Sequence, residues 1–469
     1  MARSSTYIGD AREGSVRTTR RLMLPMIAAF IVTSLTFSST ATAAPFRTDG
    51  RPQVVPLAPG VTLTPILTTG DVVNRRFQFT GEPDGIGVYE RDGKLEVLMN
   101  HELSHFWGDV SDSRIDHLTL NANAEAVGAE YFLDGTEGYW WMCSSTLDRI
   151  AGKYWYLTGE EWIGSDKGGI SIAMNARTGR YFETPWFGKL NHENVVPLKR
   201  LDEAVMWLSE DNFQIRSQAY AYFADSFRGA LRGRGVLTAF VPNDPGDGDP
   251  SANDLAKGET MRGRFVPIPR AQRLNGRQLN AVTEDLGAFT FIRVEDAAVD
   301  PDEPGVVYVS DTGSYRPASD SKEGRLYRFT LNPANPRRAT LQVVLDADAG
   351  DPILNPDNLG ISDTTLMIQE DHNRAATRAA RIWALDLGTG SLTAVARTDP
   401  TKGAITRAGG RGVWETSGIV DVSAYYGPGT WLLSSMAHYT KVAQQGLDLR
   451  IDSDEGEGGQ LLLMNAPGT

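Results

Sequence analysis

The sequence predicts an all-β fold, a six-bladed β-propeller with long loops between its strands, on three observations. Segments that favour strand structure are short and rich in aromatic and β-branched residues, as at 94–99, 153–157, 205–208 and 306–309. The 469 residues include 48 glycines and 24 prolines, which favour many turns over long helices. One pattern of polar residue and apolar strand recurs about every 60 residues.

Each repeat begins with a polar residue, and an apolar strand with a polar end follows it. We call the first residues of the repeats the upstream series: Asp84, Cys143, Glu193, Glu295, Asp357 and Glu415. The strand ends are His101, Glu160, Glu210, Asp311, Glu370 and His438, and the first three follow their upstream residue by 17 positions. An antiparallel sheet that repeats in this way is typical of a propeller blade. An ordinary β-sandwich with acidic turns is the alternative, but it does not explain three equal offsets.

The first 43 residues have the anatomy of an export signal. Arg20 and Arg21 precede a weakly apolar run at 25–37, and small residues at 41–43 offer a cleavage site. The arginine pair favours the twin-arginine route, and a general secretory signal with incidental arginines is the alternative. The remaining residues, 44–469, are predicted to form a single propeller domain with an insertion at about 225–285. We therefore expect a secreted product, periplasmic or extracellular.

Composition and charge exclude several classes of protein. The formal net charge of −13 argues against a nucleic-acid-binding protein. After the signal, no apolar stretch reaches the roughly 18 residues that a membrane-spanning helix needs. The single cysteine excludes an intramolecular disulfide, so Cys143 needs another explanation.

The upstream series predicts a metal site. The first strand of each propeller blade lines the central channel, so these residues would face one another across it. Several carboxylates that lie close together in a poorly solvated channel require compensating cations. Carboxylate oxygens favour Ca²⁺ or Mg²⁺, whereas a thiolate favours iron or zinc, so a mixed site is expected. A buried Cys143 that binds nothing is the alternative.

Six ordered segments carry a resemblance to a known family. They are Leu98–Glu102, Met142–Ser145 with Gly159–Glu161, His192–Val195, Arg293–Asp296, Pro356–Asn358 with Gln369–Asp371, and Glu415–Ile419 with Ala437–Tyr439. Together they resemble the secreted bacterial PhoX-type alkaline phosphatases, and the chain looks like a divergent branch of that family. The resemblance implies a propeller, a twin-arginine signal and a calcium–iron cluster that hydrolyses phosphomonoesters.

The resemblance also implies a ligand set. The candidate metal ligands are Asp84, Glu102, Cys143, Glu160, Glu161, Glu193, Glu210, Glu295, Asp357, Glu370 and Glu415. Cys143 would bind Fe³⁺ together with nearby carboxylates, for which Asp84, Glu295 and Glu415 are candidates. The other carboxylates would mostly bind Ca²⁺.

Four residues are candidates for catalysis. Arg293 flanks Glu295, and its guanidinium could bind two phosphate oxygens at once. His101 and His192 are weaker candidates, as is Lys199. The expected substrate is a small-molecule phosphomonoester and the expected oligomeric state is a monomer. Two alternatives remain: a calcium-dependent hydrolase of another ester class, phytase-like or lactonase-like, and a non-catalytic propeller stabilised by calcium.

Overall fold

The computed structural model describes residues 44–107, 111–212, 216–244, 250–314, 321–372, 378–399, 414–438 and 458–469. The expected export signal lies outside the described residues. Strands dominate the described part, and its α-helices are short: α1 (Phe227–Ala230), α2 (Gly276–Asp285) and α3 (Ser423–Tyr426). The all-β prediction is therefore confirmed. No helix among the described residues is long and apolar enough to cross a membrane.

Two antiparallel four-stranded sheets follow each other in the first half of the chain. The first contains β5 (Pro83–Arg91), β6 (Lys94–His101), β7 (Arg114–Leu120) and β8 (Ala126–Leu133). The second contains β9 (Thr146–Ile150), β10 (Lys153–Gly159), β11 (Ser171–Asn175) and β12 (Tyr181–Glu183). In both sheets the strands pair in chain order, as expected when short turns connect neighbouring antiparallel strands.

The next sheet is continuous over nine described strands. One half contains β13 (His192–Leu198), β14 (Ala204–Glu210), β16 (Tyr220–Ala224) and β17 (Gly235–Pro242). The other half contains β20 (Val294–Val299), β21 (Val306–Asp311), β22 (Arg325–Asn332) and β23 (Asn335–Asp346). Strand β18 (Thr260–Pro267) pairs with β17 on one side and with β23 on the other. It therefore joins the outer edges of two four-stranded units, and it comes from the region expected to be an insertion.

The N-terminal strands complete the last two sheets. The first contains β24 (Pro356–Ile361), β25 (Thr365–Glu370), β26 (Arg381–Asp386), β27 (Leu392–Thr398) and β1 (Val54–Pro56). The other contains β28 (Trp414–Asp421), β29 (Thr430–Ala437), β30 (Gly458–Asn465) and β2 (Thr62–Thr68). Two short pairs join β3 (Val72–Asn74) to β4 (Phe77–Gln78), and β15 (Ser217–Gln218) to β19 (Thr290–Phe291). The start and end of the described chain are thus held together by sheet pairing.

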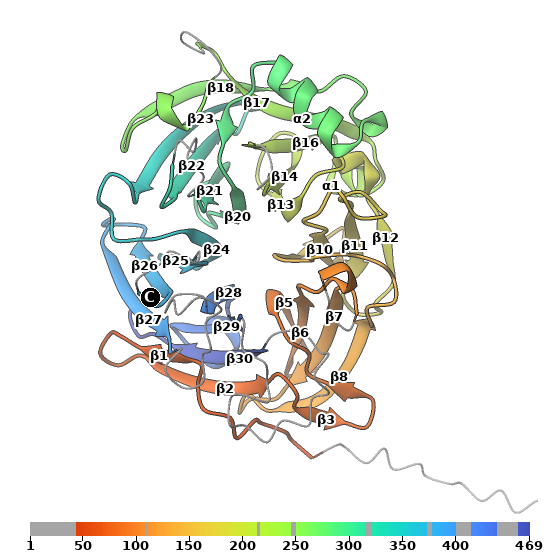
Figure 1. Ribbon diagram of the computed structural model, residues 1–469, viewed down its shortest axis with the longest axis vertical. Coiled ribbons are helices and arrows are strands. Elements are labelled where there is room, and N and C mark those ends of the chain that lie inside the picture. Colours follow the sequence, from red (N-terminus) through yellow and green to blue (C-terminus); the bar gives the residue numbers. More distant parts are fainter. Residues whose placement is uncertain are drawn as a thin grey trace, which may run out of the picture. The chain divides into compact units, whose positions relative to one another are not determined.

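The sheets are arranged like the blades of a propeller around a common centre (Figure 1). Strands β5, β13, β20, β24 and β28 lie nearest to that centre in Figure 1. Strand β9 lies between β5 and β13, and with it these strands form a ring in which each contacts the next and β28 contacts β5. A cavity of about 420 Å³ is lined by residues of all these strands. Apolar side chains also fill the space between the two halves of the nine-stranded sheet, for example Trp207 against Phe265 and Phe329.

Close packing of the inner strands requires glycine at two positions. A Cβ atom on Gly85 would lie 2.6 Å from the carbonyl oxygen of Cys143, and one on Gly418 would lie 2.4 Å from that of Asp84. Both neighbours are backbone atoms, which cannot move without shifting a strand. The upstream residues of adjacent sheets are therefore held close to one another by their backbones.

Candidate metal centre

A repeated backbone hydrogen bond brings the upstream residue and a second residue to the centre. We call this second residue the post-strand residue, because it comes at or just after the end of the strand that follows the upstream residue. The post-strand series is Glu102, Glu161, Asp211, Thr312, Asp371 and His438. In the first five cases its N–H donates to the carbonyl oxygen two residues before the upstream residue, at 3.0, 2.9, 3.1, 3.0 and 3.0 Å respectively.

The strand register repeats in the same way. The residue before the upstream residue pairs with the residue before the post-strand residue, as in Pro83↔His101 and His192↔Glu210. The pairs Val294↔Asp311 and Pro356↔Glu370 are equivalent. In all four strand pairs a β-bulge follows directly, and a bulge changes the direction in which the local side chains point.

Three residues that precede the upstream series by two positions adopt a left-handed backbone. They are Glu82 (φ 49°), Trp141 (φ 50°) and Asn355 (φ 50°). This conformation is uncommon outside glycine, and for a bulky residue such as tryptophan it is strained. Strain of this kind persists where the surrounding structure enforces it, often near functional sites. Here it turns the chain into the inner strand.

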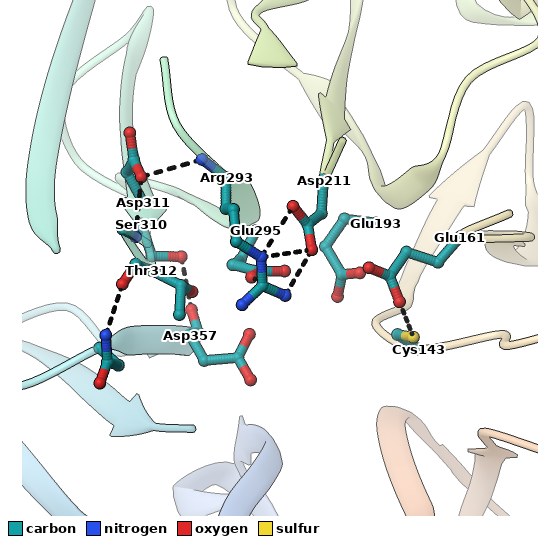
Figure 2. Close-up of polar contacts among 12 residues, drawn as sticks. Cys143, Glu161, Glu193, Asp211, Arg293, Glu295, Ser310, Asp311, Thr312 and Asp357 are labelled. Carbon is teal, nitrogen blue, oxygen red and sulfur yellow. Dashed lines mark hydrogen bonds and ion pairs between the residues drawn. The ribbon is translucent and has the colours of Figure 1, made fainter. Parts of the chain in front are cut away.

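Ten acidic or thiol side chains gather in overlapping groups at this end of the inner strands. The groups are Asp84–Glu102–Cys143, Cys143–Glu161–Glu193, Glu161–Asp211–Glu295, Glu193–Glu295–Asp357 and Asp357–Asp371–Glu415. Within each group one potential ligand atom per residue lies within 4.8 Å of the others. Figure 2 shows several of these side chains pointing into one shared space, with the Cys143 Sγ 3.1 Å from Glu161 Oε2. We call these ten residues the carboxylate–thiol cluster.

Burial and mutual repulsion perturb the acids of the cluster. Burial, with a smaller contribution from Glu415, raises the pKa of Asp84 to about 8. Burial and the neighbouring carboxylates also raise the pKa of Glu193 and of Asp357 well above the usual range. The pKa of the Cys143 thiol rises for the same reasons. Without cations, part of this cluster would be protonated at neutral pH, so binding of polyvalent cations would release protons.

Two basic side chains offset some of this charge. Arg293 donates from Nε to Asp211 Oδ2 at 2.9 Å, and its Nη2 lies 3.0 Å from Glu295 Oε1 (Figure 2). His438 lies 3.1 Å from Glu415. Burial alone would favour the neutral acid at Glu415, but the His438 imidazole outweighs it and lowers the pKa of that carboxyl to about 2.

The structure brings together most of the ligand candidates from the sequence. The cluster contains Asp84, Glu102, Cys143, Glu161, Glu193, Glu295, Asp357 and Glu415. It also contains Asp211 and Asp371, which the sequence analysis missed. Both are post-strand residues, and they follow Glu210 and Glu370 directly. In the first three repeats the post-strand residue follows the upstream residue by 18 positions. The strand ends that the sequence analysis used follow it by 17.

Three ligand candidates lie outside the groups formed by the described residues, and their carboxylates have other partners. Glu160 accepts from the backbone N–H groups of Trp140 and Ile170. Glu210 accepts from Asn280 of helix α2, and Glu370 accepts from several donors that include Trp383. Because each precedes the post-strand residue by one position, its side chain turns away from the centre.

The histidine candidates for catalysis also point elsewhere. His101 is fully buried between the Gly81 carbonyl (2.8 Å) and Asp116 (2.9 Å). His192 is fully buried as well, with Nε2 3.1 Å from the Gly188 carbonyl, and burial lowers its pKa to about 4. Both rings therefore have structural surroundings, and neither belongs to the groups that the described residues form. Lys199 pairs with Asp148 at the surface.

Arg293 is the candidate that the structure places beside the cluster. Its side chain is 24% exposed, and two of its three nitrogens engage Asp211 and Glu295. The third nitrogen, Nη1, has no hydrogen-bond partner among the described residues. A fork-shaped donor that is held on one edge and open on the other suits recognition of a tetrahedral oxyanion.

Comparison with known proteins identifies the family. The family model described as alkaline phosphatase PhoX matches residues 175–418. This chain belongs to the PhoX alkaline phosphatase family. No curated protein matches the chain.

A solved structure of a PhoX protein agrees with the fold. Pseudomonas fluorescens PhoX, in a complex with vanadate described as a transition state analogue, is 13% identical, with a TM-score of 0.59. The match covers 90% of this chain and 97% of the other. The Pseudomonas aeruginosa periplasmic gluconolactonase PpgL is 14% identical with a TM-score of 0.39, over 84% and 91% of the two chains. The Escherichia coli soluble aldose sugar dehydrogenase is 10% identical with a TM-score of 0.38, over 86% and 99%.

Proposed function

We propose that this protein is a secreted phosphatase that hydrolyses phosphomonoesters with metal ions held by the carboxylate–thiol cluster. Membership of the PhoX family supports the reaction class. The observation that carries the proposal is the cluster itself, with its five overlapping three-residue groups among the described residues. So many acids in a buried space can all be ionised together only with compensating cations.

The donor set fits two kinds of metal. Carboxylates alone make up the groups around Glu295, Asp357 and Glu415, and such oxygen ligands suit Ca²⁺. Cys143 supplies a soft donor to the groups around Glu102 and Glu161, which suits a transition metal such as Fe³⁺. Bound cations at these positions would neutralise charge on the phosphoryl oxygens and lower the pKa of water.

Arg293 would bind the phosphate group. Asp211 and Glu295 hold its Nε and Nη2 edge, so the guanidinium plane is fixed before the substrate arrives. The remaining edge can donate to phosphoryl oxygens, whose charge it would stabilise throughout the reaction. Asp211 therefore has two roles, as a member of the cluster and as the partner that orients Arg293.

The blade number and the export route are part of the proposal. We count six blades, because the nine-stranded sheet divides into two four-stranded units joined by β18. The closed ring of inner strands from β5 to β28 supports that number. The arginine pair at Arg20 and Arg21 supports export by the twin-arginine route, which carries folded proteins.

A phosphatase assay with metal removal tests the proposal. The protein, purified after export with its own signal, is assayed on p-nitrophenyl phosphate before and after exhaustive chelation. We expect hydrolysis that is lost on chelation and restored by calcium and iron together. Restoration by calcium alone, or activity only on a lactone, would favour the calcium-dependent hydrolase instead. Full phosphatase activity after complete metal removal would refute the proposal.

A further inference from the structure

In four sheets, the residue that directly precedes the post-strand residue forms a hydrogen bond between its side chain and the backbone at one recurring position; three carboxylates accept from an N–H group there, and His101 contacts a carbonyl oxygen. That position lies three residues before the upstream residue. The bonds are His101 Nδ1 to Gly81 O (2.8 Å), Glu160 Oε1 to Trp140 N (3.1 Å), Asp311 Oδ2 to Ile292 N (3.0 Å) and Glu370 Oε1 to Leu354 N (2.8 Å). All four side chains are fully buried. The recurrence indicates one structural device rather than four coincidences.

In three of these sheets the side chain is a carboxylate that uses both of its oxygens. Glu160 also accepts from Ile170 N at 3.1 Å. Asp311 also accepts from Arg293 N (Figure 2) and from Gly313 N, both at 3.0 Å. Glu370 also accepts from Arg381 N at 2.8 Å. A buried carboxylate with this many donors is fixed in place and binds the donating backbone firmly.

We propose that Glu160, Asp311 and Glu370 are positioning residues that hold the ligands of the candidate metal centre at binding distance before any cation arrives. This inference rests on the proposed function. Each carboxylate connects the two chain segments that carry its sheet's site residues. Glu160, for example, binds the segment that leads into Cys143, and it is itself followed directly by Glu161.

The energetic reason is the cost of assembling a site. Buried hydrogen bonds to a charged group stabilise a structure more than bonds between neutral groups do. If these bonds were absent, the segment that leads into the upstream residue could separate from the strand end. A bound cation would then have to bring the two segments together. Groups that orient metal ligands in this way typically change metal affinity by about 10–100-fold when they are replaced.

Asp311→Asn is the most informative variant. An asparagine oxygen can still accept from Arg293 N and Gly313 N, but the new NH₂ group would face the N–H of Ile292. One bond is therefore lost and two donors oppose each other, with little change in volume. Asp346→Asn is the matched control, because Asp346 is a buried aspartate of the same sheet that pairs with Arg325 (2.9 Å) and is not part of the cluster.

The experiment measures Ca²⁺ affinity of the metal-depleted full-length protein by calorimetry, and the rate of Ca²⁺ release to a chelator by stopped flow. Both are measured well below the melting temperature of every variant. We expect Asp311→Asn to weaken Ca²⁺ binding about tenfold, to speed release, and to raise KM more than it lowers kcat, because Arg293 moves with it. Asp346→Asn should lose a comparable amount of stability and keep the wild-type affinity.

Two outcomes overturn the inference. Wild-type Ca²⁺ affinity and release in Asp311→Asn would do so, and so would an equal loss in the Asp346→Asn control. If Asp311→Asn does not fold, Glu160→Gln is measured instead, with the same expected loss and the same control. A wild-type protein that binds no Ca²⁺ would refute the proposed metal centre itself. Ca²⁺ binding that is unchanged in the variants would refute only the positioning role.

Discussion

Replacement of Arg293 by lysine tests the role of this side chain in phosphate binding. The guanidinium uses Nε and Nη2 to contact Asp211 and Glu295 and leaves Nη1 for a substrate oxygen. A lysine keeps the positive charge but has a single nitrogen, which cannot bind the two carboxylates and the phosphate in the same fixed plane. We therefore expect the loss of about one charge-assisted hydrogen bond to the phosphate.

The size of the effect follows from that bond. Such a bond is worth roughly 1.5–3 kcal/mol, which corresponds to about 10–100-fold in affinity. We expect Arg293→Lys to lower kcat/KM by this factor and to raise the inhibition constant of inorganic phosphate similarly. Steady-state kinetics on p-nitrophenyl phosphate with phosphate as competitor measures both quantities.

A second arginine provides the control. Arg325 is buried in the same sheet and pairs with Asp346, and it is not among the residues that surround the cluster. Arg325→Lys should reduce the melting temperature while kcat/KM of the folded protein stays near that of the wild type. If Arg293→Lys retained wild-type phosphate inhibition and KM, the assignment of Arg293 as the phosphate-binding residue would be wrong.

Three further predictions follow from the same structure. Cys143→Ser should remove the visible absorption band expected of thiolate-bound iron while calcium stays bound, and an unchanged spectrum would exclude Cys143 as a ligand. Gly418→Ala places a Cβ atom 2.4 Å from the Asp84 carbonyl oxygen, so we expect a loss of about 1–3 kcal/mol in unfolding experiments, and unchanged stability would contradict this packing. At Glu96, the close contact with His117 and the hydrogen bond from Thr119 overcome burial and lower the carboxyl pKa, so its stabilisation is present above about pH 4.5 and lost as pH falls further. Glu96→Gln should therefore reduce stability at pH 7 and flatten the acid dependence of the melting temperature, and parallel curves for the two proteins would contradict the shift.

The upstream series could be predicted from sequence because it has a simple periodic cause. Each inner strand starts at the same end of its sheet, so its first polar residue recurs with the blade. Asp84, Cys143, Glu193, Glu295, Asp357 and Glu415 all lie at the predicted point of their repeat and converge in the structure. Their role as ligands stays a prediction.

The sequence predicts less well which residue at each strand end faces the centre. Glu160–Glu161, Glu210–Asp211 and Glu370–Asp371 are adjacent acids, and composition does not indicate which one faces the centre. The choice depends on the β-bulge and on the backbone hydrogen bond that fixes the post-strand residue. As a result, the sequence predicts Glu160, Glu210 and Glu370 as ligands and does not single out Asp211 or Asp371.

Long-range pairing was also hidden from the sequence. Strand β18 bridges β17 and β23, and its pairing with β23 joins residues far apart in the sequence, such as Arg262 and Thr340. Strand β2 pairs with β30 at the opposite end of the chain. Neither pairing leaves a local periodic signal, because it depends on which sheet edges remain open after the local sheets have formed.

The metal content of the native protein tests the central claim most directly. The protein is exported with its own signal, purified without chelators, and analysed by inductively coupled plasma and native mass spectrometry. The account predicts several polyvalent cations per chain, calcium and iron among them, and loss of phosphatase activity in step with their removal. A protein that contains no calcium or transition metal and still hydrolyses phosphomonoesters would contradict it.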